Sequence, residues 1–200
     1  MLHAYLPRTL PEELEVLIEL ALDLRWTWSH AGDALWQTIA PDIWERTQNP
    51  WMLLQNVSKE RFEQLVKDPL FLAQLAQLKL ERSQYYHQDG CFQCDDPSIQ
   101  LGSIAYFSME YGLGEALPIY AGGLGILAGD LLKSASDLNL PLVGVGLLYQ
   151  QGYFRQLIDA QGLQQAFYPY NEPASLPIRP ALDKQGNRLI NRAVHQIITI

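Results

Sequence analysis

Residues 103–149 read "SIAYFSMEYGLGEALPIYAGGLGILAGDLLKSASDLNLPLVGVGLLY" and carry the clearest structural pattern in the chain. Short apolar runs at 103–110 and 142–149, each bounded by turn residues, predict two buried strands. Apolar residues at helical spacing predict a helix between them, with Asn139 and Pro141 placed to end it. A strand, a helix and a strand in succession predict a βαβ unit, and therefore a parallel sheet with a right-handed crossover.

Gly122, Gly123 and Gly125 lie where this helix should begin. Glycines at such a position allow close packing of the helix on the sheet, or they expose backbone N–H groups on which an anion can rest. The spacing leaves both explanations open, because it matches neither a Walker loop nor a standard dinucleotide fingerprint. Lys133 is the only basic residue between 101 and 154, so an anion held here would need cationic partners from elsewhere.

Glu110 ends the first predicted strand, and this places it at the carboxyl edge where open α/β sheets bind ligands. Its carboxylate is therefore a candidate site group. A solvated strand end and a contact with a helix terminus remain alternative explanations.

The first 87 residues predict only helices. The run "TLPEELEVLIELALDLRWTWS", residues 9–29, predicts one helix with a capping box formed by Thr9 and Glu12. Further helices are expected at 34–39, at 42–46, after Ser58 and after Asp68. All five tryptophans fall in this part, and core packing is favoured for them over sugar stacking. The predicted fold class is α/β, with an all-helical region at 1–95 followed by the βαβ part at 96–200.

The remaining segments contain no candidate site residues. Residues 87–100 have the composition of a linker and contain Cys91 and Cys94, which lack the further ligands of a zinc site, so we predict no metal. Residues 152–168 predict a hairpin that turns at Asp159–Gly162. The run "AVHQIITI" at 193–200 is a strand pattern that stops with the chain, and we interpret the chain as truncated.

Composition excludes several classes of protein. A net charge of −8 argues against non-specific nucleic-acid binding, which needs a basic surface. No apolar run approaches the roughly 20 residues of a membrane span. The N-terminal residues lack the pattern of a secretory signal. We therefore expect a cytoplasmic protein with neither a nucleic-acid partner nor a membrane partner.

The run "IAYFSMEYGLGEALPIYAGGLGILAGDLLKSASDLNLPLVGVGLLYQQGYFRQ", residues 104–156, resembles the N-terminal catalytic region of the glycogen/starch (α-glucan) phosphorylase family. The similarity is to the short bacterial and archaeal form. Within 10–95, "LRWTWS" and "IWERTQNPWMLL" resemble the helical extension that precedes the catalytic part in that subfamily.

The resemblance implies a GT-B fold, in which two Rossmann-like domains face each other across a cleft. It implies transfer of a glucosyl unit from an α-1,4-glucan to inorganic phosphate, which gives glucose 1-phosphate. Pyridoxal phosphate would be bound by a lysine of the C-terminal domain, beyond residue 200. A homo-oligomer is compatible with the family. Because the basic residues that grip the phosphates also lie beyond residue 200, we expect this chain to be inactive alone.

The same resemblance assigns roles to residues of the loop. Gly122, Gly123 and Leu124 would offer backbone N–H groups to the substrate phosphate, and Gly125 would shape the turn. Glu110 would have a supporting role, orienting basic groups around the phosphates.

Two other classes of protein are alternatives to a phosphorylase. A glycogen or starch synthase has a lysine two residues before the first glycine of its loop, where this chain has Tyr120. A non-catalytic glucan-binding module would bind glucan without dependence on phosphate.

Overall fold

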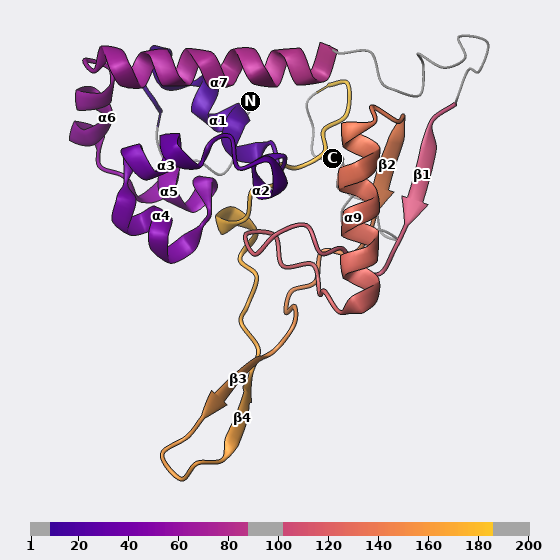
Figure 1. The fold of residues 1–200 in the computed structure, drawn as a ribbon. Coiled ribbons are helices and arrows are strands. Elements are labelled where there is room, and N and C mark those ends of the chain that lie inside the picture. Colours follow the sequence, from indigo (N-terminus) through magenta and orange to yellow (C-terminus); the bar gives the residue numbers. More distant parts are fainter. Residues whose placement is uncertain (1–8, 88–101, 186–200) are drawn as a thin grey trace.

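The computed structural model describes residues 9–87 and 102–185, and Figure 1 shows its ribbon. The first range is helical. Its elements are the 3₁₀ helix η1 (Glu12–Leu14) and the helices α1 (Val16–Leu22), α2 (Trp26–Ser29), α3 (Asp33–Ile39), α4 (Pro41–Thr47), α5 (Pro50–Asn56), α6 (Lys59–Leu65) and α7 (Pro69–His87). The long helix α7 runs along one side of the shorter ones (Figure 1).

The single helix predicted over residues 9–29 is wrong, because the segment divides into η1, α1 and α2. The predicted capping box is also wrong: η1 is preceded by Pro11, and no side chain caps it. Asp23 adopts an extended conformation and its Oδ1 accepts a hydrogen bond from the Arg25 N–H, 3.1 Å away. A short polar side chain that binds a nearby backbone N–H competes with the helix, and this explains the break.

The other predicted helices are confirmed, and one was missed. Ser58 caps α6 by accepting from the Arg61 N–H, and Asp68 accepts from the N–H groups of Leu70 and Phe71 at the start of α7. The missed helix is α5, which Asn49 caps by accepting from two backbone N–H groups at 3.0 and 3.1 Å. Its sequence signal is an Asn-Pro pair, a favourable N-cap followed by a favourable first residue.

The helical part buries one apolar core. Trp36, Trp44 and Trp51 lie in it with leucines from most of the helices, which confirms the core prediction for these three tryptophans. Trp26 and Trp28 are only half-buried. Trp26 packs against a second core, formed mainly by residues of 111–176, so it lies at the junction between the two cores.

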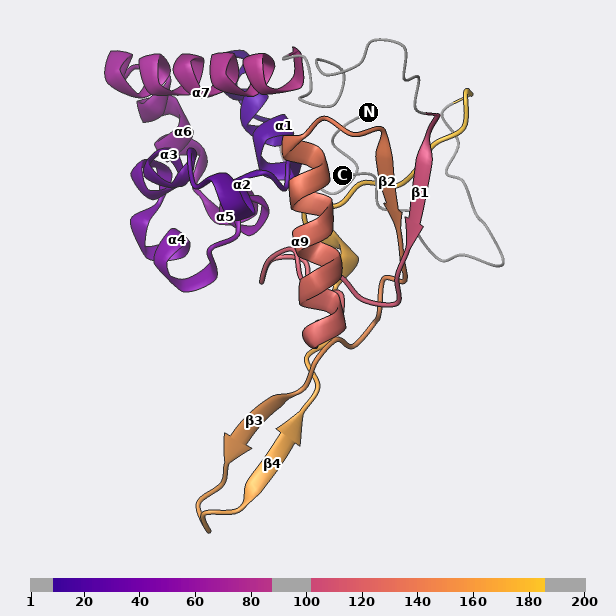
Figure 2. The same cartoon turned by 45° about the vertical axis from the view of Figure 1, so that its right-hand side comes forward.

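The predicted βαβ unit is confirmed. Strand β1 (Ile104–Phe107) pairs in parallel with β2 (Leu142–Val145), and helix α9 (Gly123–Asp137) connects them and lies against the pair (Figure 2). Asn139, the second residue after α9, has a positive φ of 52°, as a helix-ending residue should. The fold is thus mixed α/β.

The prediction that the first strand is buried is wrong for the described part of the chain. Ile104 is 38% exposed and Phe107 is 73% exposed. Within that part β1 pairs only with β2, so most of its surface has no neighbour to cover it.

The predicted hairpin is confirmed as β3 (Arg155–Ile158) and β4 (Gln164–Phe167), an antiparallel pair that projects from the body of the molecule (Figure 1). Gly162 supplies the positive φ of 80° that its turn requires. A short 3₁₀ helix, η2 (Pro173–Ser175), follows. The predicted linker beyond residue 87, including Cys91 and Cys94, and the predicted strand at 193–200 lie outside the described residues.

Besides the packing of Trp26 against the second core, hydrogen bonds join the helical part to the α/β part in two regions. Trp51 Nε1 and Gln55 Nε2 both donate to the carbonyl of Ala174, at 2.9 and 2.7 Å. Trp28 Nε1 and the Tyr85 hydroxyl both donate to Asp137 Oδ1, at 3.2 and 2.8 Å. Asp137 is the last residue of α9, so this second contact holds the C-terminal end of that helix.

Candidate functional site

The glycine-rich loop forms the N-terminus of α9, as predicted. Gly122 is the N-cap residue, and its carbonyl accepts the N–H of Ile126 at 3.0 Å. The helix runs antiparallel to β1 and β2, so its N-terminus lies beyond the carboxyl ends of both strands (Figure 1). The helix dipole is positive at this end, and the first N–H groups have no partner within the helix.

Glu110 lies against the first turn of α9. Its Oε2 accepts the Gly122 N–H at 2.6 Å. A Cβ at Gly125 would lie only 3.0 Å from the same oxygen, so the carboxylate crosses the turn closely. A carboxylate is stabilised at a helix N-terminus, and this contact explains the position of Glu110. Among the described residues, no lysine or arginine forms an ion pair with it.

The three predicted N–H donors differ in availability. Gly122 already donates to Glu110. The N–H groups of Gly123 and Leu124 form no hydrogen bond among the described residues. A Cβ at Gly123 would meet nothing within 4 Å, and the Leu124 side chain is 70% exposed. The structure therefore leaves two open N–H groups at the helix N-terminus.

Close packing accounts for other glycines of the same helix. The Gly125 carbonyl accepts the N–H of Gly112 at 2.7 Å. A Cβ at Gly129 would overlap the Gly112 carbonyl oxygen, so α9 approaches this loop backbone to backbone. Packing thus explains Gly125 and Gly129, whereas Gly123 leaves its backbone N–H open.

Two tyrosines support the loop, and the sequence patterns had not indicated either. Tyr111 is buried, and its hydroxyl donates to the carbonyls of Tyr106 at 2.6 Å and Val145 at 3.2 Å. It thereby links the ends of β1 and β2, and burial raises the pKa of its hydroxyl. Tyr120 has a positive φ of 36°, a strained conformation for a tyrosine. Its ring lies 5.2 Å from that of Tyr153, at the base of the hairpin.

The described residues do not form a site for pyridoxal phosphate. Lys133, the lysine of α9, is ten residues along the helix from Gly123, roughly 15 Å at the helical rise, so it does not reach the open N–H groups. Within residues 9–87 and 102–185 no cluster of His, Cys, Asp or Glu could hold a metal ion. In the same ranges no helix has both the length and the apolar character needed to cross a membrane.

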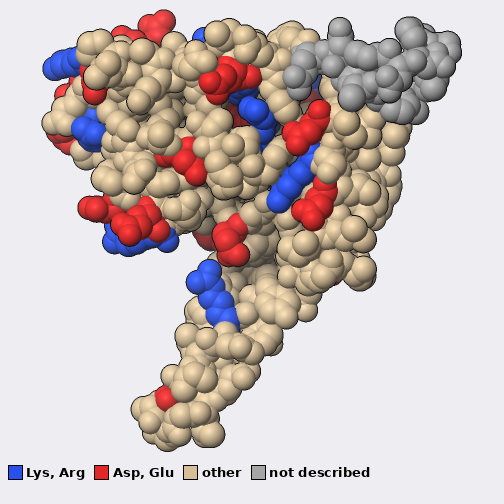
Figure 3. Space-filling model, viewed as in Figure 1, with Lys and Arg blue, Asp and Glu red and all other residues tan. Residues whose placement is uncertain are grey.

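Charge and apolar surface differ between the two parts. Charged side chains lie over the helical part and over the upper part of α9, whereas the lower end of α9 and most of the hairpin are uncharged (Figure 3). The exposed apolar residues there include Leu124, Ile126, Leu127, Leu131, Ile158 and Phe167.

The chain belongs to the protein family described as "Protein of unknown function (DUF3417)", which matches residues 10–117. It is 40% identical over 183 residues to the maltodextrin phosphorylase of Thermococcus litoralis and 42% identical over 187 residues to the glycogen phosphorylase of Mycobacterium tuberculosis. It is 38% identical over 176 residues to the glycogen phosphorylase of Aquifex aeolicus. No solved structure gives a significant match.

These similarities cover 88–90% of the chain, so the resemblance to the α-glucan phosphorylases is confirmed over most of its length. The chain in turn spans only 22–25% of the length of the three relatives. Most of what those proteins contain therefore has no counterpart in this sequence.

Proposed function

We propose that this chain is part of an α-glucan phosphorylase, a glycosyltransferase that moves a glucosyl unit from an α-1,4-glucan to inorganic phosphate. The observation that carries the proposal is the similarity to maltodextrin and glycogen phosphorylases over nine tenths of the chain. The chain alone is inactive, because it spans less than a third of those relatives and supplies no cation at the loop.

In this proposal the open N–H groups of Gly123 and Leu124 bind the substrate phosphate. Gly122 completes the turn through its bond to Glu110, and Gly125 lets the Glu110 carboxylate cross it. Because Glu110 and a phosphate are both negative, the bound state requires cations near them. Glu110 orients these basic groups, which come from residues beyond this sequence. Pyridoxal phosphate would be held by residues beyond this sequence and would supply proton transfer when bound.

The proposed architecture is a GT-B fold, with residues 1–95 as a helical extension and 96–200 as the first part of the N-terminal Rossmann-like domain. The exposed apolar faces of β1, α9 and the hairpin support this, because further chain would cover them. The proposed partners are an α-glucan and phosphate or glucose 1-phosphate, in the cytoplasm. We also propose that the full-length protein forms a homo-oligomer.

The test is phosphorolysis by a polypeptide of the relatives' length that contains this sequence. We expect glucose 1-phosphate from maltodextrin and phosphate, and an absorption band of bound pyridoxal. Glucan binding with no turnover and no cofactor would instead favour a binding module. Transfer from a sugar nucleotide would favour a synthase.

Gly123→Val in that polypeptide tests the loop. Valine would crowd the two open N–H groups, and losing hydrogen bonds to a charged group costs about 1.5–3 kcal/mol. We expect kcat/KM for phosphate to fall at least about tenfold. Gly102→Val is the matched control, since a Cβ there also meets nothing within 4 Å. If Gly123→Val reduces stability as much as activity, the glycine serves packing and the phosphate role is wrong.

A further inference from the structure

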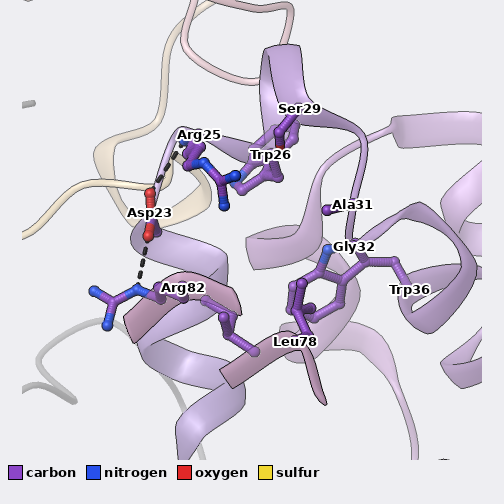
Figure 4. A pocket seen from close by; sticks show the side chains of 10 residues that line it. Asp23, Arg25, Trp26, Ser29, Ala31, Gly32, Trp36, Leu78 and Arg82 are labelled. Atoms are coloured by element: carbon purple, nitrogen blue, oxygen red, sulfur yellow. Dashed lines mark hydrogen bonds and ion pairs between the residues drawn. The ribbon is translucent and has the colours of Figure 1, made fainter. Parts of the chain in front are cut away.

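A small pocket opens in the helical part, away from the glycine loop. It is lined by residues of α1, α2, α3 and α7 and of the turns between them (Figure 4). Its polar lining comes from Asp23, Arg25, Ser29, Trp36 and Arg82. Its volume of about 30 Å³ has room for roughly two water-sized groups, which admits two oxygens of a small anion that otherwise faces solvent but is too little to enclose a sugar ring.

Two buried donors on this pocket have no acceptor. Among the described residues, Trp36 Nε1 and Arg25 Nε are buried and form no hydrogen bond. Trp36 is only 1% exposed, so its indole N–H cannot donate to bulk solvent, and the pocket is the space left for an acceptor. In Figure 4 the indole nitrogen and the Arg25 guanidinium point into the same space from opposite sides. A buried donor without an acceptor is costly, so the pair indicates that an acceptor binds between them.

The charges indicate that this acceptor is an anion. Asp23 is fully engaged: its Oδ2 accepts from Arg82 Nε at 2.7 Å and its Oδ1 from the Arg25 N–H at 3.1 Å. Arg25 has no carboxylate partner among the described residues; its guanidinium carbon lies 4.0 Å from the centre of the Tyr85 ring. Arg82, by contrast, is paired with both Asp23 and Glu19, at 2.7 and 3.5 Å. Arg25 is therefore the cation of this lining that lacks an ion-pair partner among the described residues.

Gly32 keeps the indole N–H accessible. A Cβ at this position would lie 2.9 Å from Trp36 Nε1 and 3.4 Å from a Leu78 methyl carbon. A side chain at position 32 would therefore crowd the indole N–H.

We propose that this pocket binds a small oxyanion, held by Arg25 and by the Trp36 indole N–H. The ligand class is inorganic phosphate or sulfate, or a phosphate group carried on a larger molecule. This site is separate from the glycine loop and does not depend on the proposed phosphorylase activity.

The test is a titration of the ¹⁵N-labelled chain with sodium phosphate, at constant ionic strength kept with sodium chloride. The Trp36 indole N–H resonance, assigned from Trp36→Phe, should shift and saturate. Arg25→Gln should weaken binding about tenfold or more, because it removes a hydrogen bond to a charged group. Arg46→Gln is the matched control; it removes the same charge from α4, where Arg46 Nε donates to the Asp42 carbonyl. Gly32→Ala should also weaken binding, because its Cβ would lie 2.9 Å from Trp36 Nε1 and crowd this donor.

The proposal is overturned if phosphate and sulfate give no saturable shift, if chloride gives the same shift, or if Arg25→Gln and Arg46→Gln bind alike. A titration with glucose 1-phosphate distinguishes the two sources of the anion. If it shifts the Trp36 resonance, the pocket accepts a phosphate group on a larger molecule. If only inorganic phosphate shifts the resonance, the pocket binds the free ion alone. The Gly123 amide in the same spectra reports on the loop, so failure of one site is distinguishable from failure of the other. Should Trp36→Phe not fold, the Arg25 and Gly32 variants carry the test.

Discussion

Replacing Gly129 by alanine tests the close approach of α9 to the loop before it. The added Cβ would overlap the Gly112 carbonyl oxygen and lie 2.7 Å from the carbonyl carbon, and these backbone atoms cannot rotate away. Overpacking costs about 1–3 kcal/mol, and the upper end applies where backbone must move. The higher helix propensity of alanine offsets about 1 kcal/mol. We expect the free energy of unfolding to fall by about 2 kcal/mol.

The assay is urea unfolding followed by far-ultraviolet circular dichroism. With a denaturant slope of about 2 kcal/mol per molar urea, the midpoint should fall by about 1 M. Gly123→Ala is the control in the same helix. Its Cβ meets nothing within 4 Å, so its free energy of unfolding should stay within about 0.5 kcal/mol of the parent chain.

Equal midpoints for the parent chain and Gly129→Ala would refute the close approach of α9 to Gly112. Equal losses in both alanine variants would refute the distinction between a packing glycine and an open one. Only a loss confined to position 129 agrees with the structure.

Two further outcomes follow from particular contacts. Asn49→Ala removes the cap of α5 and should lower the free energy of unfolding by about 1 kcal/mol, measured by urea unfolding against Asn56→Ala, an exposed site within the helix. Burial, then the neighbouring Asp23, raises the pKa of Tyr86 to about 12. The folded state therefore binds the Tyr86 hydroxyl proton more tightly than the unfolded state does. This difference adds to the free energy of unfolding below pH 10, and the added stability is lost as the pH rises toward 12. Tyr86→Phe should show a smaller decline in stability over that range; an unchanged decline would mean that Tyr86 is not responsible.

Features set by neighbouring residues in the chain were predictable from the sequence. Ser58 and Asp68 cap their helices as expected, because an N-cap acts on residues two or three positions away. The βαβ order and the Asp159–Gly162 turn follow from hydrophobic spacing and turn residues. The break after α1 was missed because Asp23 sits within a run whose apolar spacing remains helical.

Features set by distant residues were not predictable. Glu110 could be placed at the sheet edge, but its bond to Gly122 depends on how the eleven residues between them fold back. The role of Gly129 depends on a backbone oxygen of Gly112. The exposure of β1 depends on which strands lie beside it. The pocket at Trp36 joins residues from four helices and has no local sequence signal.

Asp137, at the C-terminal end of α9, is hydrogen-bonded to Trp28 and Tyr85 of the helical part. A change in the angle of α9 at this contact would move the N-terminal end of the helix. A helix of 15 residues is about 22 Å long, so a tilt of about 5° pivoting at Asp137 displaces Gly123 by about 2 Å. Displacements of that size exceed the tolerance of a hydrogen bond to a phosphate oxygen. A tilt about the contact at Asp137 would therefore change where the open N–H groups of Gly123 and Leu124 point.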